Sequence, residues 1–529
     1  MPTIHNPILP GFHPDPSICR AGDDYYIANS TFEWFPGVAI YHSRDLVNWR
    51  LAARPLDRPE QLDMRGNMNS GGIWAPCLSH ADGLFWLIYT DVKSSRKGWK
   101  DTPNYLVTAP EITGPWSNPI FLNASGFDPS LFHDDDGRKW LVNMINDHRK
   151  GRNPFGGIIL KEYSHEQRRL VGPVVDIFKG TSLGVTEGPH LYKHEGWCYL
   201  MTAEGGTSYR HAVTMCRSRN LAGPYEVDPT NPILTAANDA RLTLQKAGHA
   251  SLVETADGQW YLAHLCGRPI TKDRRCPLGR ETALQRVAWT ADGWLRLAGG
   301  GREPQVDVPG PDLPVWQPPA LPPARDDFGW PALADCFLSL RVPADESWMS
   351  LTARPGFLRL VGRGSLVSLH TQSMIARRVE AFRCAAATCL DFDPQTHQQM
   401  AGLVAYYNTE NWMYLCLSRD ENLGRCLRIC LMDNGAYDEP LAGDVPAPAG
   451  PINLAVAFDY QKLQFHYSQG HMSVADLAGW TPIGPALDAS KLSDDYVQGP
   501  AFTGAFVGLC CQDLAGTGRP ADFDWFEYR

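Results

Sequence analysis

Three acidic side chains recur at similar places in a repeat, and their types are those that perform acid–base chemistry. Asp15 stands in HPDPS, Asp128 in FDPS and Glu187 in EGPH. Carboxyl groups that converge in one cavity repel each other, so one holds a proton while another stays ionised. Cleavage of a glycosidic bond needs this division, because one carboxyl protonates the leaving oxygen and another activates water. The alternative is that these side chains only bond the amides of turns at strand starts.

The repeat itself predicts the scaffold. With Asp15, Ala75, Asp128, Glu187 and His249 taken as equivalent, successive copies are 60, 53, 59 and 62 residues apart. Each copy contains a short motif, an apolar strand, a Gly- or Asp-containing turn and an aromatic strand, which indicates hairpins. An all-β repeat of this length predicts one blade of a propeller. Five blades around an axis, each starting its innermost strand near the centre, would bring the three carboxyl groups into one cavity.

The sequence pattern changes after the fifth repeat, which indicates two domains. We expect an all-β protein with a five-bladed β-propeller over residues 1–305 and a Pro-rich linker over 306–325. Strand-sized runs without the 60-residue period continue over residues 326–529 and predict a β-sandwich.

Charge and hydropathy exclude several classes of partner. The net charge of −10 disfavours nucleic acid and anionic membranes, and no apolar run is long enough to span a bilayer. The first residues contain no basic and apolar signal segment, so we expect a cytoplasmic protein. No CxxC pairs with zinc-site spacing occur among the cysteines, so we expect no zinc site.

At the acidic motifs, the chain resembles glycoside hydrolase family 43, in its β-xylosidase branch with a C-terminal lectin-like β-sandwich. The matching stretches are NPILPGFHPDPS, GFDPS, TEGPH and LGRET, followed near the end by GAFVG and ADFDWF. The resemblance implies that Asp15 is the general base and Glu187 the general acid. Asp128 would be a third carboxylate that raises the pKa of the acid and orients it. It also implies inversion at the anomeric carbon.

The resemblance also suggests a shallow pocket for one terminal xylose. Trp74 and Phe127 would pack on the apolar face of the sugar and Phe32 would line the mouth, although all three side chains also suit a propeller core. A loop of the C-terminal domain would close the pocket with an aromatic side chain near Phe502 or Phe506, and we favour Phe502. A pocket closed at one end favours exo-action.

Two further positions complete the expected substrate site. Arg280 matches an arginine that binds sugar hydroxyls, and its charge would help to keep Asp15 and Asp128 ionised. A surface salt bridge is the alternative. His249 would lie near the axis, and we favour a neutral, hydrogen-bonded histidine over a ligand of a divalent ion.

No cofactor is expected for catalysis. Oxygen ligands for a structural calcium ion are available at Asp326 or Asp327 together with Asp522 and Asp524, but strand-end carboxylates without metal are the favoured interpretation.

The predicted activity is that of an inverting exo-β-1,4-xylosidase, which releases xylose from the non-reducing end of xylooligosaccharides. An additional α-L-arabinofuranosidase activity is expected, and a predominant one is the first alternative. A non-catalytic carbohydrate-binding propeller is the second, and a protein-docking scaffold ranks last. The resemblance also implies a homo-oligomer, either a dimer or a tetramer.

Overall fold

The protein folds into two compact units built almost entirely from β-strands. A computed structural model describes residues 2–96, 98–470 and 473–529. The first unit contains Met1–Arg268 and Arg280–Pro319, and the second contains Pro269–Gly279 and Ala320–Arg529. The predicted all-β class is confirmed. No helix in the described ranges is long and apolar enough to cross a membrane.

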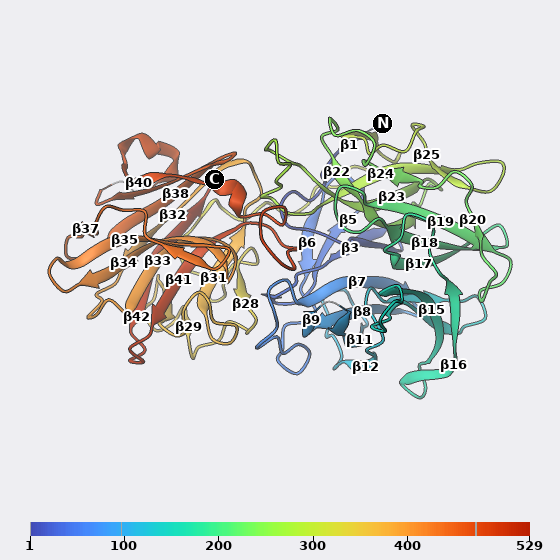
Figure 1. The fold of residues 1–529 in the computed structure, drawn as a ribbon, viewed down its shortest axis with the longest axis horizontal. Helices are drawn as coiled ribbons and strands as arrows, with labels where there is room; N and C mark the ends of the chain where they lie inside the picture. Colours follow the sequence, from blue (N-terminus) through green and yellow to red (C-terminus); the bar gives the residue numbers. More distant parts are fainter. Residues whose placement is uncertain (1, 97, 471–472) are drawn as a thin grey trace. The chain divides into compact units, whose positions relative to one another are not determined.

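The first unit contains five blades of antiparallel strands, labelled in Figure 1. The first two blades contain β2 (Ser17–Ala21), β3 (Asp24–Asn29), β5 (Ala39–Ser43) and β6 (Arg50–Ala53), and then β7 (Gly72–Ala81), β8 (Leu84–Val92), β11 (Asn104–Ala109) and β12 (Ile120–Asn123). The third contains β13 (Ser130–His133), β14 (Lys139–Asn146), β15 (Phe155–Ser164) and β16 (Arg169–Phe178).

The fourth blade contains β17 (Glu187–His194), β18 (Trp197–Glu204), β19 (Ala212–Ser218), β20 (Glu226–Val227) and β21 (Leu234–Thr235). The fifth contains β22 (Gln245–Glu254), β23 (Trp260–Gly267), β24 (Glu281–Trp289) and β25 (Leu295–Leu297). Outside the blades lie β4 (Trp34–Phe35) and a hairpin of β9 (Ser94–Arg96) and β10 (Trp99–Asp101). The innermost strand of the fifth blade, β22, contacts that of the first, β2, so the ring is closed. The predicted five-bladed propeller is confirmed.

Three serines tie neighbouring blades together at the same place in the repeat. Ser17 accepts from Leu78 N of the second blade at 3.0 Å. Ser130 donates to Pro189 O of the fourth blade at 2.6 Å. Ser251 of the fifth blade accepts from the backbone N–H of Ile18 at 2.9 Å and donates to the carbonyl oxygen of Pro16 at 2.8 Å, both in the first blade. These bonds satisfy buried backbone groups that the sheets leave unpaired.

The N-terminal segment closes the ring against the fifth blade. β1 (Thr3–His5) pairs antiparallel with β26 (Asp307–Pro309). The side chain of Asn6 donates to Leu284 O at 2.7 Å and accepts from Leu284 N at 2.8 Å, so it mimics a strand partner for β24. The two ends of the first unit are therefore held by one set of contacts.

The backbone corrects the predicted register of the fourth blade by one residue. Asp15, Asp128 and His249 share a left-handed conformation, with φ of 53°, 52° and 46°. In the fourth blade this conformation belongs to Gly188, with φ of 56°, and not to Glu187. The serine hydrogen bonds support this register. Their accepting carbonyls belong to Pro16, which follows Asp15, and to Pro189, which follows Gly188. Glu187 thus approaches the ring from the residue before the turn.

The second unit is a two-sheet sandwich, as predicted. One sheet contains β27 (Arg325–Asp326), β29 (Met349–Ser350), β30 (Leu358–Val361), β32 (Arg383–Asp391), β38 (Ile452–Asp459), β39 (Lys462–Ser468), β40 (Thr481–Asp488) and β42 (Pro520–Tyr528). The other contains β28 (Leu338–Leu340), β31 (Ser373–Arg378), β33 (Gln399–Asn408), β34 (Asn411–Asp420), β35 (Gly424–Asp433), β36 (Ala436–Asp438), β37 (Val445–Pro446) and β41 (Phe506–Asp513). Two short 3₁₀-helices, η1 (Val474–Gly479) and η2 (Ala489–Lys491), also belong to this unit. Leu403 and Leu509 from one sheet pack with Leu454 and Phe523 from the other in its core.

Replacing Ser251 by alanine tests the inter-blade bonds. The change leaves Ile18 N and Pro16 O buried without their partner, so we expect a loss of about 1–3 kcal/mol in the free energy of unfolding. Denaturant unfolding measures it. Ser94→Ala, at an exposed position of β9, is the control, and equal stability of the two variants would contradict the role of Ser251.

Candidate active site

Asp15 is held at the start of the first blade by a network that also positions Arg280. The chain before the turn is fixed because His13 N donates to Arg280 O at 2.9 Å. The guanidinium Nη1 of Arg280 donates to Asp15 Oδ1 at 2.9 Å and to Thr207 Oγ1 at 3.0 Å. Ser30 Oγ donates to the other oxygen of Asp15 at 2.7 Å. Arg280 is only 3% exposed, so its contact with Asp15 is a buried ion pair and not a surface one.

This environment favours the ionised form of Asp15. Burial alone would raise the pKa of this carboxyl, but the charge of Arg280 and the hydrogen bond from Ser30 outweigh burial and hold the pKa below its ordinary value. A carboxylate that stays ionised across the physiological range is suited to accept a proton from water.

Asp128 and Glu187 form the opposite environment. Burial and the negative charge of Asp15 raise the pKa of Glu187 to about 7. Burial and the charge of Glu187 raise the pKa of Asp128 well above its ordinary value. The charge of Arg280 does lower the pKa of Asp128, as expected, but burial and the charges of Glu187 and Asp15 outweigh it. The predicted ionisation of Asp15 agrees with its lowered pKa.

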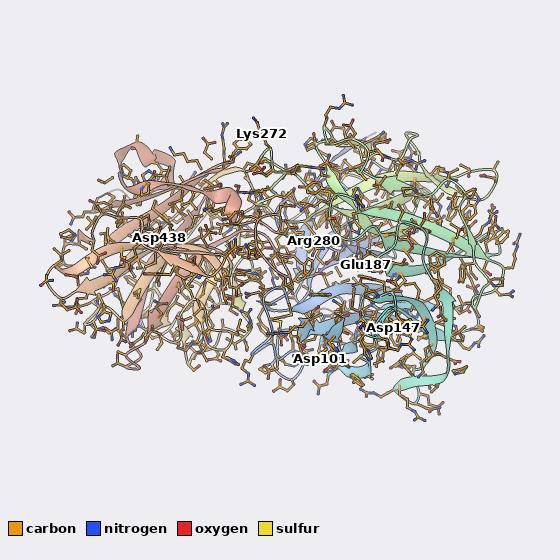
Figure 2. The ribbon with its side chains drawn as sticks, viewed as in Figure 1. Asp101, Asp147, Glu187, Lys272, Arg280 and Asp438 are labelled. Atoms are coloured by element: carbon orange, nitrogen blue, oxygen red, sulfur yellow. The ribbon has the colours of Figure 1, made fainter. Side chains whose placement is uncertain are left out.

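Asp128 also fixes the backbone beside the candidate acid. Its Oδ2 accepts from Gly188 N at 3.0 Å. A side chain at Gly188 is disfavoured, since the residue has φ of 56° and a Cβ there would lie 3.1 Å from the His249 ring. The sequence EG in the fourth blade thus places the glycine in the turn and Glu187 beside it. Figure 2 labels Glu187 and Arg280 within the first unit.

An aromatic row adjoins these polar groups. Phe32 lies 6.2 Å from Trp74, which packs edge-on against Phe127 at 5.2 Å, as measured between ring centroids. The indole of Trp74 is oriented by a 2.7 Å bond from Nε1 to Ser70 O. Arg280 lies over the Phe32 ring at 5.3 Å, so the row begins at the ion pair. Flat apolar rings beside polar donors suit a sugar, which has both apolar C–H faces and hydroxyl groups.

His249 lies near Asp15. Its Nδ1 is 3.9 Å from Asp15 Oδ1, and burial lowers the pKa of the imidazole, which favours the neutral form. Among the residues that the structure describes, no three His, Cys, Asp or Glu side chains are arranged to hold a metal ion.

Three polar residues of the site are not apparent from the repeat. Ser30 and Thr207 bond the Asp15–Arg280 pair. Lys100, on β10, has its Nζ 5.9 Å from the Trp74 ring centre and 5.5 Å from that of Phe127. All three lie outside the repeated motif, in connections that vary between blades. Only the aromatic and acidic motifs could have pointed from the sequence to the part of the fold in which these three residues lie.

The remaining predicted positions belong to the second unit. Phe502 lies just before β41 and is partly exposed, whereas Phe506 begins β41 and is buried. The role of Phe502 in closing a pocket stays a prediction. Of the proposed calcium ligands, Asp522 accepts from Arg359 at 2.7 Å and from Arg354 at 3.0 Å, and Asp327 accepts from Arg325 at 2.6 Å. Arginine therefore already compensates both carboxylates.

Comparison with known proteins identifies the same family as the sequence motifs. Residues 4–295 match the family model "Glycosyl hydrolases family 43", and residues 325–529 match "Beta xylosidase C-terminal Concanavalin A-like domain". A β-xylosidase from Bacillus subtilis is 51% identical, and the alignment covers 99% of each chain. A xylosidase/arabinosidase from Humicola insolens is 50% identical over 100% of this chain and 98% of its own. The crystal structure of a xylan β-1,4-xylosidase from Bacillus halodurans has 56% identity and a TM-score of 0.97, covering 99% of this chain and 100% of the other.

The pKa values predict a bell-shaped dependence of kcat/KM on pH. Glu187 has to be protonated, so activity falls as pH rises through about 7. Asp15 has to be ionised, and its pKa is lowered from 3.8, so activity persists until pH falls below that value. Rates on a neutral nitrophenyl glycoside measure both limbs. An alkaline limb near the ordinary pKa of a glutamate would contradict the assignment of Glu187 as the acid.

Replacing Asp128 by asparagine separates charge from hydrogen bonding. The amide oxygen still accepts from Gly188 N and, like the protonated carboxyl that the raised pKa of Asp128 favours, the amide carries no charge. We expect the alkaline limb of the pH profile to stay near pH 7, because burial and the charge of Asp15 raise the pKa of Glu187. Asp136→Asn, which removes an exposed carboxylate, serves as the control. A limb at lower pH would mean instead that Asp128 is ionised and that its charge raises the pKa of Glu187.

Proposed function

Since the chain belongs to glycosyl hydrolases family 43 and is a glycoside hydrolase, we propose that it acts as an inverting exo-β-1,4-xylosidase. It would release xylose from the non-reducing end of xylooligosaccharides. The observation that carries this proposal is the opposite electrostatic environment of Asp15 and Glu187, because an inverting glycosidase needs one ionised and one protonated carboxyl. The β-xylosidases at about half identity over the full length support the choice of sugar.

The proposed reaction is a single displacement. Asp15 would take a proton from a water molecule, which attacks the anomeric carbon while Glu187 donates its proton to the leaving oxygen. The Arg280 contact keeps the base ionised before the water arrives. Inversion requires room for that water, so we expect the two carboxyl groups to lie roughly 6.5–9.5 Å apart. Trp74 and Phe127 would support the apolar face of the xylose ring.

A second activity on α-L-arabinofuranosides is part of the proposal. Arabinofuranose and xylopyranose present hydroxyl groups in similar directions, and the Humicola insolens relative carries both names. A non-reducing-end α-L-arabinofuranosidase from Bacteroides ovatus, which is 35% identical over the whole of this chain, shows how near the two specificities lie in sequence.

Three further properties are proposals that rest on the sequence. They are a cytoplasmic location, a dimeric or tetrameric assembly, and catalysis that needs no cofactor. Cell fractionation, sedimentation of the purified protein, and activity after treatment with a chelator measure them in turn. If the protein holds a structural calcium ion, treatment with the chelator should also lower its melting temperature.

Substitution of the two carboxyl groups tests the proposal. We expect Asp15→Ala and Glu187→Ala each to lower kcat/KM on p-nitrophenyl β-D-xylopyranoside by at least about 10²- to 10⁴-fold, the usual contribution of a positioned acid or base. Asp136→Ala is a matched surface control. Activity of both site variants near that of the wild type would refute the mechanism, whereas faster turnover of the α-L-arabinofuranoside by the wild type would reverse the substrate ranking.

A further inference from the structure

A trough between the second and third blades lies next to the candidate site and has no role in the proposed reaction. Its volume is about 600 Å³, within the range of sites that hold small ligands. Its walls come from the β9–β10 hairpin, from the end of β12 and the residues after it, and from β14, β15 and β16. The lining residues are Gly98, Trp99, Lys100, Leu122, Asn123, Ala124, Ser125, Ile145, Asn146, His148, Ile159, Lys161, Leu170 and Val174.

Trp99 forms an aromatic platform at one edge of this trough. Its side chain is 69% exposed, although tryptophan side chains are highly buried on average. The indole is not loose, because it stacks on the His148 ring with centroids 4.2 Å apart and planes at 29°. Gly98 of the same hairpin also lies beside this loop, because a Cβ there would be in ordinary van der Waals contact with His148 at 3.4 Å. An exposed ring held in place in this way suits the apolar face of a sugar.

The charge of the trough is opposite to that of the whole chain. Lys100 and Lys161 line it, and none of its described lining residues is Asp or Glu, although the protein carries a net charge of −10. Of the acidic residues that flank it in sequence, labelled in Figure 2, Asp147 is paired with Arg149 at 2.6 Å and Asp101 ends β10. The amide side chains of Asn123 and Asn146 add neutral hydrogen-bonding groups. This lining favours a ligand with hydroxyl groups and a carboxylate.

Lys100 connects the trough with the candidate site. Its side chain lines the trough, and its Nζ lies over the Trp74 and Phe127 rings that would support the terminal xylose. A chain whose terminal sugar occupies the site would therefore have its remaining residues directed past Lys100. The outer part of the trough, at Trp99, His148 and Lys161, would then face a residue further along the chain.

We propose that this outer trough binds an acidic branch, a uronic acid carried by an inner residue of the xylooligosaccharide. Trp99 stacks on the sugar, and Lys161 pairs with its carboxylate. This inference rests on the proposed function, because the chain reaches the trough only if its terminal xylose occupies the site. It adds a preference for acid-substituted over neutral oligosaccharides.

Binding to a catalytically inactive form tests the preference. Calorimetry with the Glu187→Gln variant compares linear xylotetraose with a xylotetraose that carries one glucuronic acid on an inner residue. We expect tighter binding of the acidic ligand, and an added Lys161→Gln change should weaken it about 5-fold without affecting the neutral one. Lys161→Arg should retain the preference. Lys179→Gln, which alters a lysine of the same blade outside the trough lining, is the control.

Two further measurements complete the test. Added salt should weaken the acidic ligand more than the neutral one, since the pair is partly exposed. Trp99→Ala should weaken both oligosaccharides but leave hydrolysis of p-nitrophenyl β-D-xylopyranoside unchanged. Equal binding of the two ligands to the Glu187→Gln variant, or equal effects of Lys161→Gln on both, would overturn the proposal. Failure of the wild type to hydrolyse the nitrophenyl xyloside would instead overturn the proposed function.

Discussion

Of three buried carboxyl groups in the first unit, Asp15 is the one that an arginine contacts directly, and this imbalance governs the electrostatics of the site. The guanidinium of Arg280 contacts Asp15, and burial leaves Asp128 and Glu187 with raised pKa values. A low-dielectric site tolerates one paired charge far better than three unpaired ones, so protons have to remain on the other groups. The proposed assignment of base and acid therefore rests on which carboxyl the arginine contacts. The blades serve to hold that arrangement rigid.

The architecture was predictable because the repeat is encoded locally. Each blade carries its own turns and strand periodicity, so the spacing of Asp15, Ala75 and Asp128 was enough to predict a propeller and a ring of acidic residues. The register of the fourth blade was not predictable in the same way. Aligning acid with acid placed Glu187 in the turn, whereas the left-handed backbone there selects Gly188. The functional side chain thus departs from the repeat by one residue.

The rest of the site depends on contacts that no repeat specifies. Ser30, Thr207 and Lys100 come from connecting segments that differ from blade to blade, and their types are common on any surface. Their roles arise only when distant segments meet. The same reason explains why the sequence could not rank Asp15 and Asp128, since only the structure shows that Arg280 contacts Asp15 and that burial outweighs its effect on Asp128.

The pairing of β1 with β26 has a consequence for folding during synthesis. The strand that completes the ring contains Thr3–His5, which leaves the ribosome before the five blades, but its partner extends to Pro309. The side chain of Asn6 likewise can donate its hydrogen bond only after Leu284 has been synthesised. Domains generally fold during synthesis, from the N-terminal end. Here Thr3–His5 has to remain without its partner until about three hundred more residues have been added, so the ring stays open while the blades are being synthesised.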